Sequence, residues 1–205
     1  MNLSFTVTAL ALAALGSFGA ASAATAHDEA ATGDLSNNGL APTPVTFAAG
    51  SNQVLGSTGR GAAGIDRDYF SFTLAAGQQL SAIFVVPGTA TLGAFSFIGI
   101  ESGHQLTLPT TATTAAGLLG WWHYAAADVA TNILDDMGMA ANGSSGFTPP
   151  LGAGTYAVWV QDTGAGATPY GFDFQVTAAV PEPQAWALLL AGLGVLGFIR
   201  RRHQG

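Results

Sequence analysis

Hydrophobic and polar residues alternate with a period of two along much of the middle of the chain. The segment DYFSFTL places Phe70, Phe72 and Leu74 on one face, with more polar residues between them. The same alternation recurs in TYAVWV at 155–160 and in YGFDFQV at 170–176. Because successive side chains of a β-strand point to opposite faces, this pattern predicts strands that bury one face.

Further apolar segments extend the predicted sheet. LSAIFVV at 80–86 is apolar nearly throughout and is followed by Pro87-Gly88, which predicts a buried strand and a turn. FSFIGI at 95–100 and HQLTL at 104–108 are expected to form a hairpin across ESG. Turn residues separate these segments at intervals typical of a sandwich, so residues 45–179 are predicted to form an all-β, antiparallel β-sandwich.

One stretch has a helical period instead. AADVATNILDDMG places Val129, Ile133 and Met137 four residues apart, which predicts a short amphipathic helix over 128–137 that ends before Gly138. Asp135 and Asp136 would then lie in the last helical turn, where the helix dipole disfavours anions. Such a mismatch occurs at some cation sites and, more often, at solvated helix ends.

The start of the chain has the composition of an export signal. The first residues are apolar and small, and ASA at 21–23 provides an A-x-A cleavage site with Ala21 and Ala23. Residues 1–23 are therefore predicted to be a signal peptide that signal peptidase removes. The polar stretch that follows, 24–44, is expected to be a flexible lead-in to the sandwich.

The end of the chain is apolar between a proline pair and three arginines. Residues 185–199 carry no charge and would span ~22 Å as a helix, against about 30 Å for a bilayer core. This predicts a single, short transmembrane helix, with Arg200, Arg201 and Arg202 as a cytoplasmic stop and the body outside.

This ending, VPEP followed by a short apolar helix and RRR, resembles the PEP-CTERM sorting signal. The resemblance implies that an exosortase recognises Pro181, Glu182 and Pro183 within the signal at 180–205. It also implies an exported protein that the membrane holds before processing, and that then reaches the cell surface or an exopolysaccharide matrix. In that chemistry the chain is a substrate and not the catalyst.

The body is similar to bacterial pre-peptidase C-terminal (PPC) domains in three segments: DRDYFSFTLAAGQQLSAI, LGAGTYAVWVQDTG and YGFDFQVT. That resemblance implies a jelly-roll-like β-sandwich and an accessory or binding module.

Composition narrows the classes of function. The chain has no Cys and no Lys, and its formal net charge is −7, so it offers no thiol nucleophile and no P-loop lysine, and it is a poor partner for nucleic acid. GRGAAG at 59–64 matches G-x-G-x-x-G by letters, but a strand pattern follows it, which predicts a turn before a strand. We therefore expect a non-enzymatic protein without a required cofactor.

Two groups of residues are candidates for binding. Trp121, Trp122 and Tyr124 form the densest aromatic cluster, which would bind polysaccharide if exposed or close one end of the sandwich if buried. The carboxylates Asp66, Asp68, Asp135 and Asp136 are candidate ligands for calcium.

Three functional alternatives remain open from the sequence. The first is a self-associating structural matrix protein without a ligand, the second a calcium-dependent binding module, and the third a hydrolase with an acidic pair.

Overall fold

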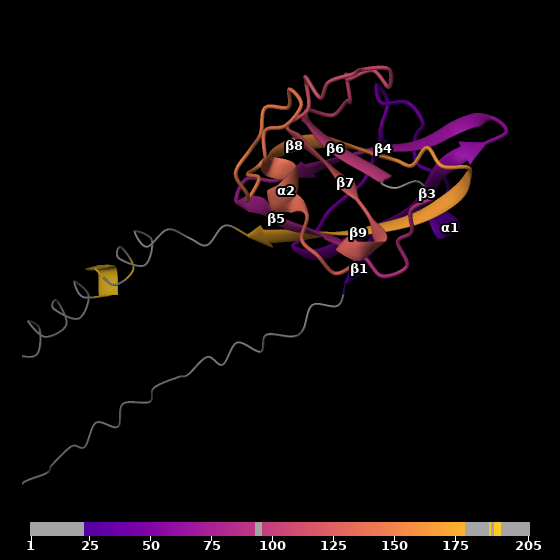
Figure 1. Ribbon diagram of the computed structural model, residues 1–205. Helices are drawn as coiled ribbons and strands as arrows, with labels where there is room; N and C mark the ends of the chain where they lie inside the picture. Colours follow the sequence, from indigo (N-terminus) through magenta and orange to yellow (C-terminus); the bar gives the residue numbers. More distant parts are fainter. Residues whose placement is uncertain (1–22, 93–95, 179–188, 190, 194–205) are drawn as a thin grey trace, which may run out of the picture.

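The structure is a computed structural model that describes residues 23–92, 96–178, 189 and 191–193. Strands dominate it (Figure 1). The elements are β1 (Ala24–Asp28), α1 (Glu29–Thr32), β2 (Thr43–Pro44), β3 (Gly50–Gly61), β4 (Gly64–Leu74), β5 (Gln78–Val85), β6 (Ser96–Ser102), β7 (Gly120–Tyr124), a 3₁₀ turn (Ala126–Asp128), α2 (Leu134–Gly138), β8 (Gly154–Gln161) and β9 (Gly166–Ala178).

The strands form two layers that the β3–β4 hairpin joins. The strand order is β5-β9-β3-β4-β8-β6-β7, and every neighbouring pair on this path is antiparallel. The short strands β1 and β2 add in parallel to β3 and β4. In Figure 1, β4, β6 and β8 lie in one layer, and β5 and β9 lie in the other. This arrangement confirms the predicted all-β sandwich.

The core lies between the two layers and includes the residues that the period-two pattern selected. Phe70 of β4 meets Phe174 of β9 edge to face, with ring centroids 5.7 Å apart, so the two layers touch through aromatic side chains. Tyr69, which points the other way, is also buried, in a second cluster with Trp159 on the outer side of β4 and β8. Both faces of this layer are therefore covered.

The predicted hairpin between 95–100 and 104–108 is wrong. β6 pairs instead with β7 and β8, and residues 104–108 form no strand. Leu106 is buried, but its backbone N–H donates to the Gly39 carbonyl rather than to a neighbouring strand. The strand β7 was not predicted because its consecutive aromatic residues show no alternation of polar and apolar residues. In addition, a five-residue segment does not indicate which distant strand it pairs with.

The predicted helix over 128–137 is also wrong in extent, because the first half of this segment forms backbone hydrogen bonds with the edge of β5 instead. The Ala130 and Ile133 N–H groups donate to the Val85 and Ile83 carbonyls, at 2.8 and 2.9 Å. Only Leu134–Gly138 remains α-helical, so Asp135 and Asp136 lie in the first turn and not the last. The helix dipole favours anions there, which removes the predicted mismatch.

Residues 24–44 are folded and not a flexible lead-in. β1 and β2 use the free backbone groups of β3 and β4, and the Leu35 side chain is 2% exposed within the core. The segment looked like a linker because an edge strand needs few apolar side chains when the sheet supplies its backbone partners. This segment is therefore part of the β-sandwich.

The glycine-rich segment 59–64 forms the tip of the β3–β4 hairpin, with the predicted turn at Ala62 and Ala63. Gly59 has φ +145°, and a Cβ atom there would lie 1.9 Å from the Gly166 carbonyl oxygen. A close approach of two backbones explains the glycine, and no helix follows it to hold a phosphate.

Candidate functional site

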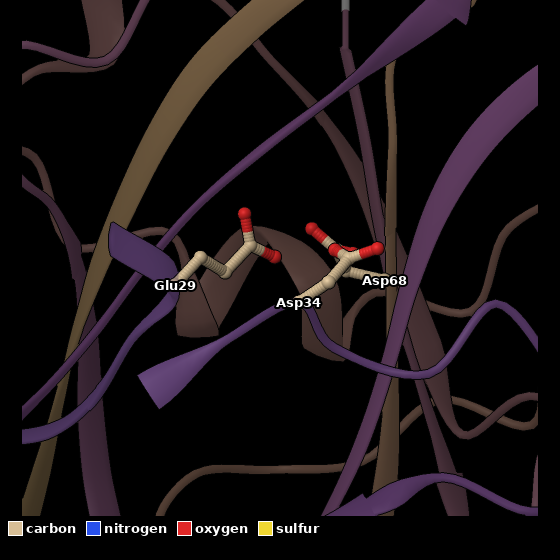
Figure 2. Close-up of side chains that lie close together, drawn as sticks. All are labelled: Glu29, Asp34 and Asp68. Atoms are coloured by element: carbon tan, nitrogen blue, oxygen red, sulfur yellow. The ribbon is translucent and has the colours of Figure 1, made fainter. Parts of the chain in front are cut away.

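Three carboxylates from separate parts of the fold converge at one end of the sandwich. Glu29 begins α1, Asp34 lies in the turn after α1, and Asp68 lies on β4. One carboxylate oxygen from each residue lies within 4.8 Å of the other two. Figure 2 shows the carboxyl group of Glu29 directed toward those of Asp34 and Asp68. Oxygen donors at this spacing suit a hard cation.

The local backbone holds Glu29 in place. Its Oε2 accepts a hydrogen bond from Ser57 N–H at 2.8 Å, and its Oε1 accepts one from Leu35 N–H at 3.4 Å. Gly56 leaves the space that this requires, because a Cβ atom there would lie 2.8 Å from Glu29 Oε1 and 2.7 Å from Tyr170 Oη. The space beside Gly56 therefore accommodates both the Glu29 carboxylate and the Tyr170 hydroxyl.

Asp68 is fully buried, and neither of its carboxylate oxygens has a hydrogen-bond partner. Tyr170 is only 3% exposed, and its hydroxyl also lacks a hydrogen-bond partner. It lies close enough to lower the Asp68 pKa in part, without reaching hydrogen-bond geometry. Two more buried hydroxyls without partners, Thr58 and Thr168, face each other across β3 and β9, two residues further along. Buried polar groups without partners are rare in folded proteins.

Burial and mutual repulsion shift the acid–base behaviour of the cluster. Burial, followed by the negative charge of Glu29, raises the pKa of Asp68 to about 9. Burial also raises the pKa of Glu29, and it raises that of Tyr170 well above the ordinary value. The two arginines of the described part of the chain donate elsewhere, Arg60 to the Thr163 carbonyl and Arg67 to Gln161. Asp68 thus holds a proton at neutral pH unless a cation replaces it.

The predicted calcium set of four aspartates does not form one site. Asp66 accepts a hydrogen bond from the Asn37 side chain, and Asp135 and Asp136 lie on α2. Only Asp68 joins the carboxylate cluster. Sequence reasoning missed Glu29 and Asp34 because they lie in the segment interpreted as a linker. The acidic spacing in DEAATGD was the signal available there.

The predicted aromatic cluster is divided between the two faces of β7. Tyr124 is 1% exposed and packs edge to face on Phe172, at 5.0 Å, and Trp122 packs on the same core. Trp121 points to the other side, where it stacks on Phe97 with ring centroids 6.1 Å apart. Tyr124 therefore cannot join a binding surface, whereas Trp121 and Trp122 both line a hollow beside α2 although they lie on opposite faces of β7.

The outer side of β6, β7 and β8 carries a hollow of about 190 Å³, which we call the outer hollow. Its aromatic side chains are Phe97, Trp121 and Trp159, and Phe97 meets Trp159 edge to face at 5.0 Å. Polar side chains complete the lining, among them Asn142 and Gln161. Sequence reasoning identified Trp121 of this set and missed the others, which come from distant strands.

Several predicted residues lie outside the described part of the chain. These are Ala21, the sorting residues Pro181, Glu182 and Pro183, and the arginines Arg200, Arg201 and Arg202. Ala23 is described and exposed, and it immediately precedes β1. Leu189 and residues 191–193 are helical, but the rest of the predicted span 185–199 is not described. Within the described residues, every helix falls short of the length and hydrophobicity needed to cross a membrane.

Comparison with known proteins identifies the tail. Residues 179–202 match the PEP-CTERM protein-sorting motif. No curated protein and no solved structure matches the chain, and the similarity of the body to PPC domains is not confirmed. The match covers all three predicted parts of the tail, namely the Pro-Glu-Pro residues, the apolar stretch and the arginines. The chain therefore carries a PEP-CTERM protein-sorting motif, which marks an exported protein that an exosortase sorts.

Proposed function

We propose that the chain is a non-enzymatic protein of the cell surface or exopolysaccharide matrix whose β-sandwich binds polysaccharide. The sorting motif at 179–202 carries the first part of this proposal, because it delivers the β-sandwich to the outside of the cell. The sequence supports the absence of catalysis, since it lacks thiol and lysine nucleophiles. Ser144, in the glycine-rich loop, donates its hydroxyl to the Ala141 carbonyl and has a structural role there.

The outer hollow supports polysaccharide binding. Trp121 and Phe97 offer flat apolar rings on which the C–H face of a sugar can stack, and Asn142 and Gln161 offer amide groups for its hydroxyls. A net charge of −7 opposes an anionic polymer, so a neutral polysaccharide is the better ligand. The proposed surface thus shares Trp121 with the predicted set and leaves out Trp122, which is partly buried against the core, and Tyr124, which is fully buried.

Processing of the tail tests the first part of the proposal. In a host with an exosortase, we expect the mature protein to lack residues 200–205, because the enzyme cuts near the Pro-Glu-Pro residues. Exchanging Pro181 and Pro183 for alanine should leave the tail attached in most molecules, whereas Pro109→Ala, in a loop of the sandwich, should not. Intact-mass spectrometry of the exported protein measures this. A wild-type protein that keeps its arginines in such a host contradicts sorting.

Retention on polysaccharide tests the second part. We expect Trp121→Ala to weaken binding to the host's own exopolysaccharide about tenfold, because a stacked aromatic ring contributes roughly 0.5–1.5 kcal/mol beyond its buried area. Leu40→Ala removes an exposed side chain that does not line the outer hollow, so this control should bind like the wild type. Affinity electrophoresis measures both variants. Equal retention of Trp121→Ala and the wild type contradicts polysaccharide binding, and concentration-dependent assembly without polysaccharide would then favour the self-associating alternative.

A further inference from the structure

We propose that Glu29, Asp34 and Asp68, together with the Tyr170 hydroxyl, bind one Ca²⁺ ion where α1 meets the end of the sandwich. The inference goes beyond the proposed function and does not depend on it. It concerns a different part of the molecule from the outer hollow, with no residue in common.

The donor set fits calcium by chemistry and by spacing. All four donors are oxygen atoms, and three of them are carboxylates. Two oxygens bound to one Ca²⁺ at 2.3–2.6 Å cannot lie more than about 5.2 Å apart, and the three carboxylate oxygens lie within 4.8 Å of one another. Mg²⁺ binds in a strict octahedron and usually keeps several of its waters, so a site with three protein carboxylates suits Ca²⁺ better than Mg²⁺. Water can complete the shell of six to eight ligands that Ca²⁺ takes.

The burial of Asp68 and Tyr170 points to a ligand independently of the clustering. A buried carboxylate normally accepts several hydrogen bonds, yet both Asp68 oxygens lack a donor. The Tyr170 oxygen, which is directed toward the same gap beside Gly56, lacks a partner as well. A cation between them would satisfy these oxygens at once.

Nothing positive among the described residues already neutralises this cluster. Arg60 and Arg67, the arginines nearest along the chain, bond to groups on the loop and strand around Gln161–Thr163. A divalent cation would therefore displace the proton of Asp68 and meet carboxylates that have no other counter-ion among the described residues.

An ion can also reach the site. Asp34 is exposed, and a solvent-connected cavity of about 490 Å³ is lined by two of the other proposed ligands, Glu29 and Tyr170. Glu29 and Asp34 belong to the N-terminal segment, whereas Asp68 belongs to β4. Bound calcium would thus fasten that segment to the sandwich.

Calcium titration of the full chain, freed of metal with a chelator, tests the proposal. We expect one ion per chain by calorimetry and a rise in Tm of about 5 °C at saturating Ca²⁺, since an ion that binds only the folded state stabilises it. Mg²⁺ should bind at least tenfold more weakly. Asp68→Asn should lose at least tenfold in Ca²⁺ affinity. Asp135→Asn, which removes an exposed carboxylate on α2, should bind Ca²⁺ like the wild type.

If Asp68→Asn does not fold, variants of the other proposed ligands can still test calcium binding. Glu29→Gln should then lose the calcium response while its circular dichroism spectrum stays that of a folded β protein, and Tyr170→Phe should weaken it less. The proposal is overturned if the wild type shows neither binding heat nor a change in Tm with Ca²⁺. It is also overturned if Asp68→Asn or Glu29→Gln binds Ca²⁺ as tightly as the wild type. Polysaccharide retention, measured on the same samples, reports separately on the outer hollow.

Discussion

Replacement of Phe174 by alanine is expected to lower the free energy of unfolding by about 3–5 kcal/mol. Phe174 is fully buried, and its ring lies 5.0 Å from that of Phe47 and 5.7 Å from that of Phe70. It thus connects β9 to β4 and to the segment before β3. Its removal leaves a cavity that the rigid sheets cannot close, so the loss exceeds the transfer free energy of the side chain alone.

Urea unfolding of the full chain, followed by tryptophan fluorescence, measures this effect. Leu40→Ala is the matched control, because its side chain is more than half exposed and should change the free energy of unfolding by less than about 0.5 kcal/mol. If Phe174→Ala costs no more than the control, the two layers do not pack through this ring and the described core is wrong.

Replacement of Asp68 by asparagine should have the opposite effect on stability at neutral pH, when a chelator keeps cations away. The pKa of Asp68 is about 9 in the folded protein, whereas an unfolded Asp has its ordinary value near 3.8. At pH 7 the folded state must therefore hold a proton that the unfolded state releases. Asparagine carries no such requirement, so we expect Asp68→Asn to be more stable than the wild type by ~1–3 kcal/mol at pH 7.

The sign of the pH dependence follows from the same shift. Between the unfolded and folded pKa values the folded state binds more protons, so stability falls as the pH rises from about 4 toward 9. Below pH 4 the Asp68 carboxyl is protonated in both the folded and the unfolded state, so its effect on the free energy of unfolding no longer changes with pH. The difference between wild type and Asp68→Asn should therefore grow with pH, by up to about 1.4 kcal/mol per unit.

Chemical denaturation at pH 5, 7 and 8.5 in EDTA measures this difference. A constant offset between the two proteins would show that Asp68 has an ordinary pKa and is not buried as described. Asp135→Asn provides the matched control, since it makes the same substitution at an exposed position on α2.

Some features followed from the sequence because local chemistry decides them. The period-two placement of Phe70, Phe72 and Leu74 identified both a strand and its buried face, since alternate side chains must leave a strand on opposite sides. The glycine-rich turn at 59–64 followed from conformational preference. The tail was recognisable because a sorting signal is read as a linear segment, and the match at 179–202 agrees with it.

Other features depended on which distant segments meet. Residues 128–133 have a helical pattern, but the free edge of β5 offered hydrogen bonds that an isolated helix could not match. The residues around Glu29 are polar and resemble a linker in the sequence. In the structure, the strands on either side of them, β1 and β2, pair with β3 and β4.

Both candidate sites combine residues that were recognisable in the sequence with residues that only the tertiary structure places beside them. Trp121 was visible in the sequence, but only the pairing of β6, β7 and β8 places Phe97 and Trp159 beside it. Asp68 was a candidate ligand by residue type, but Glu29 and Asp34 are more than thirty positions away. The sequence by itself determined the segments of β4, β5, β6, β8 and β9, the buried faces of those that alternate, and the sorting tail, because each depends on neighbours along the chain. The tertiary structure alone decided the partners in both sites, because contacts between distant segments leave no local pattern.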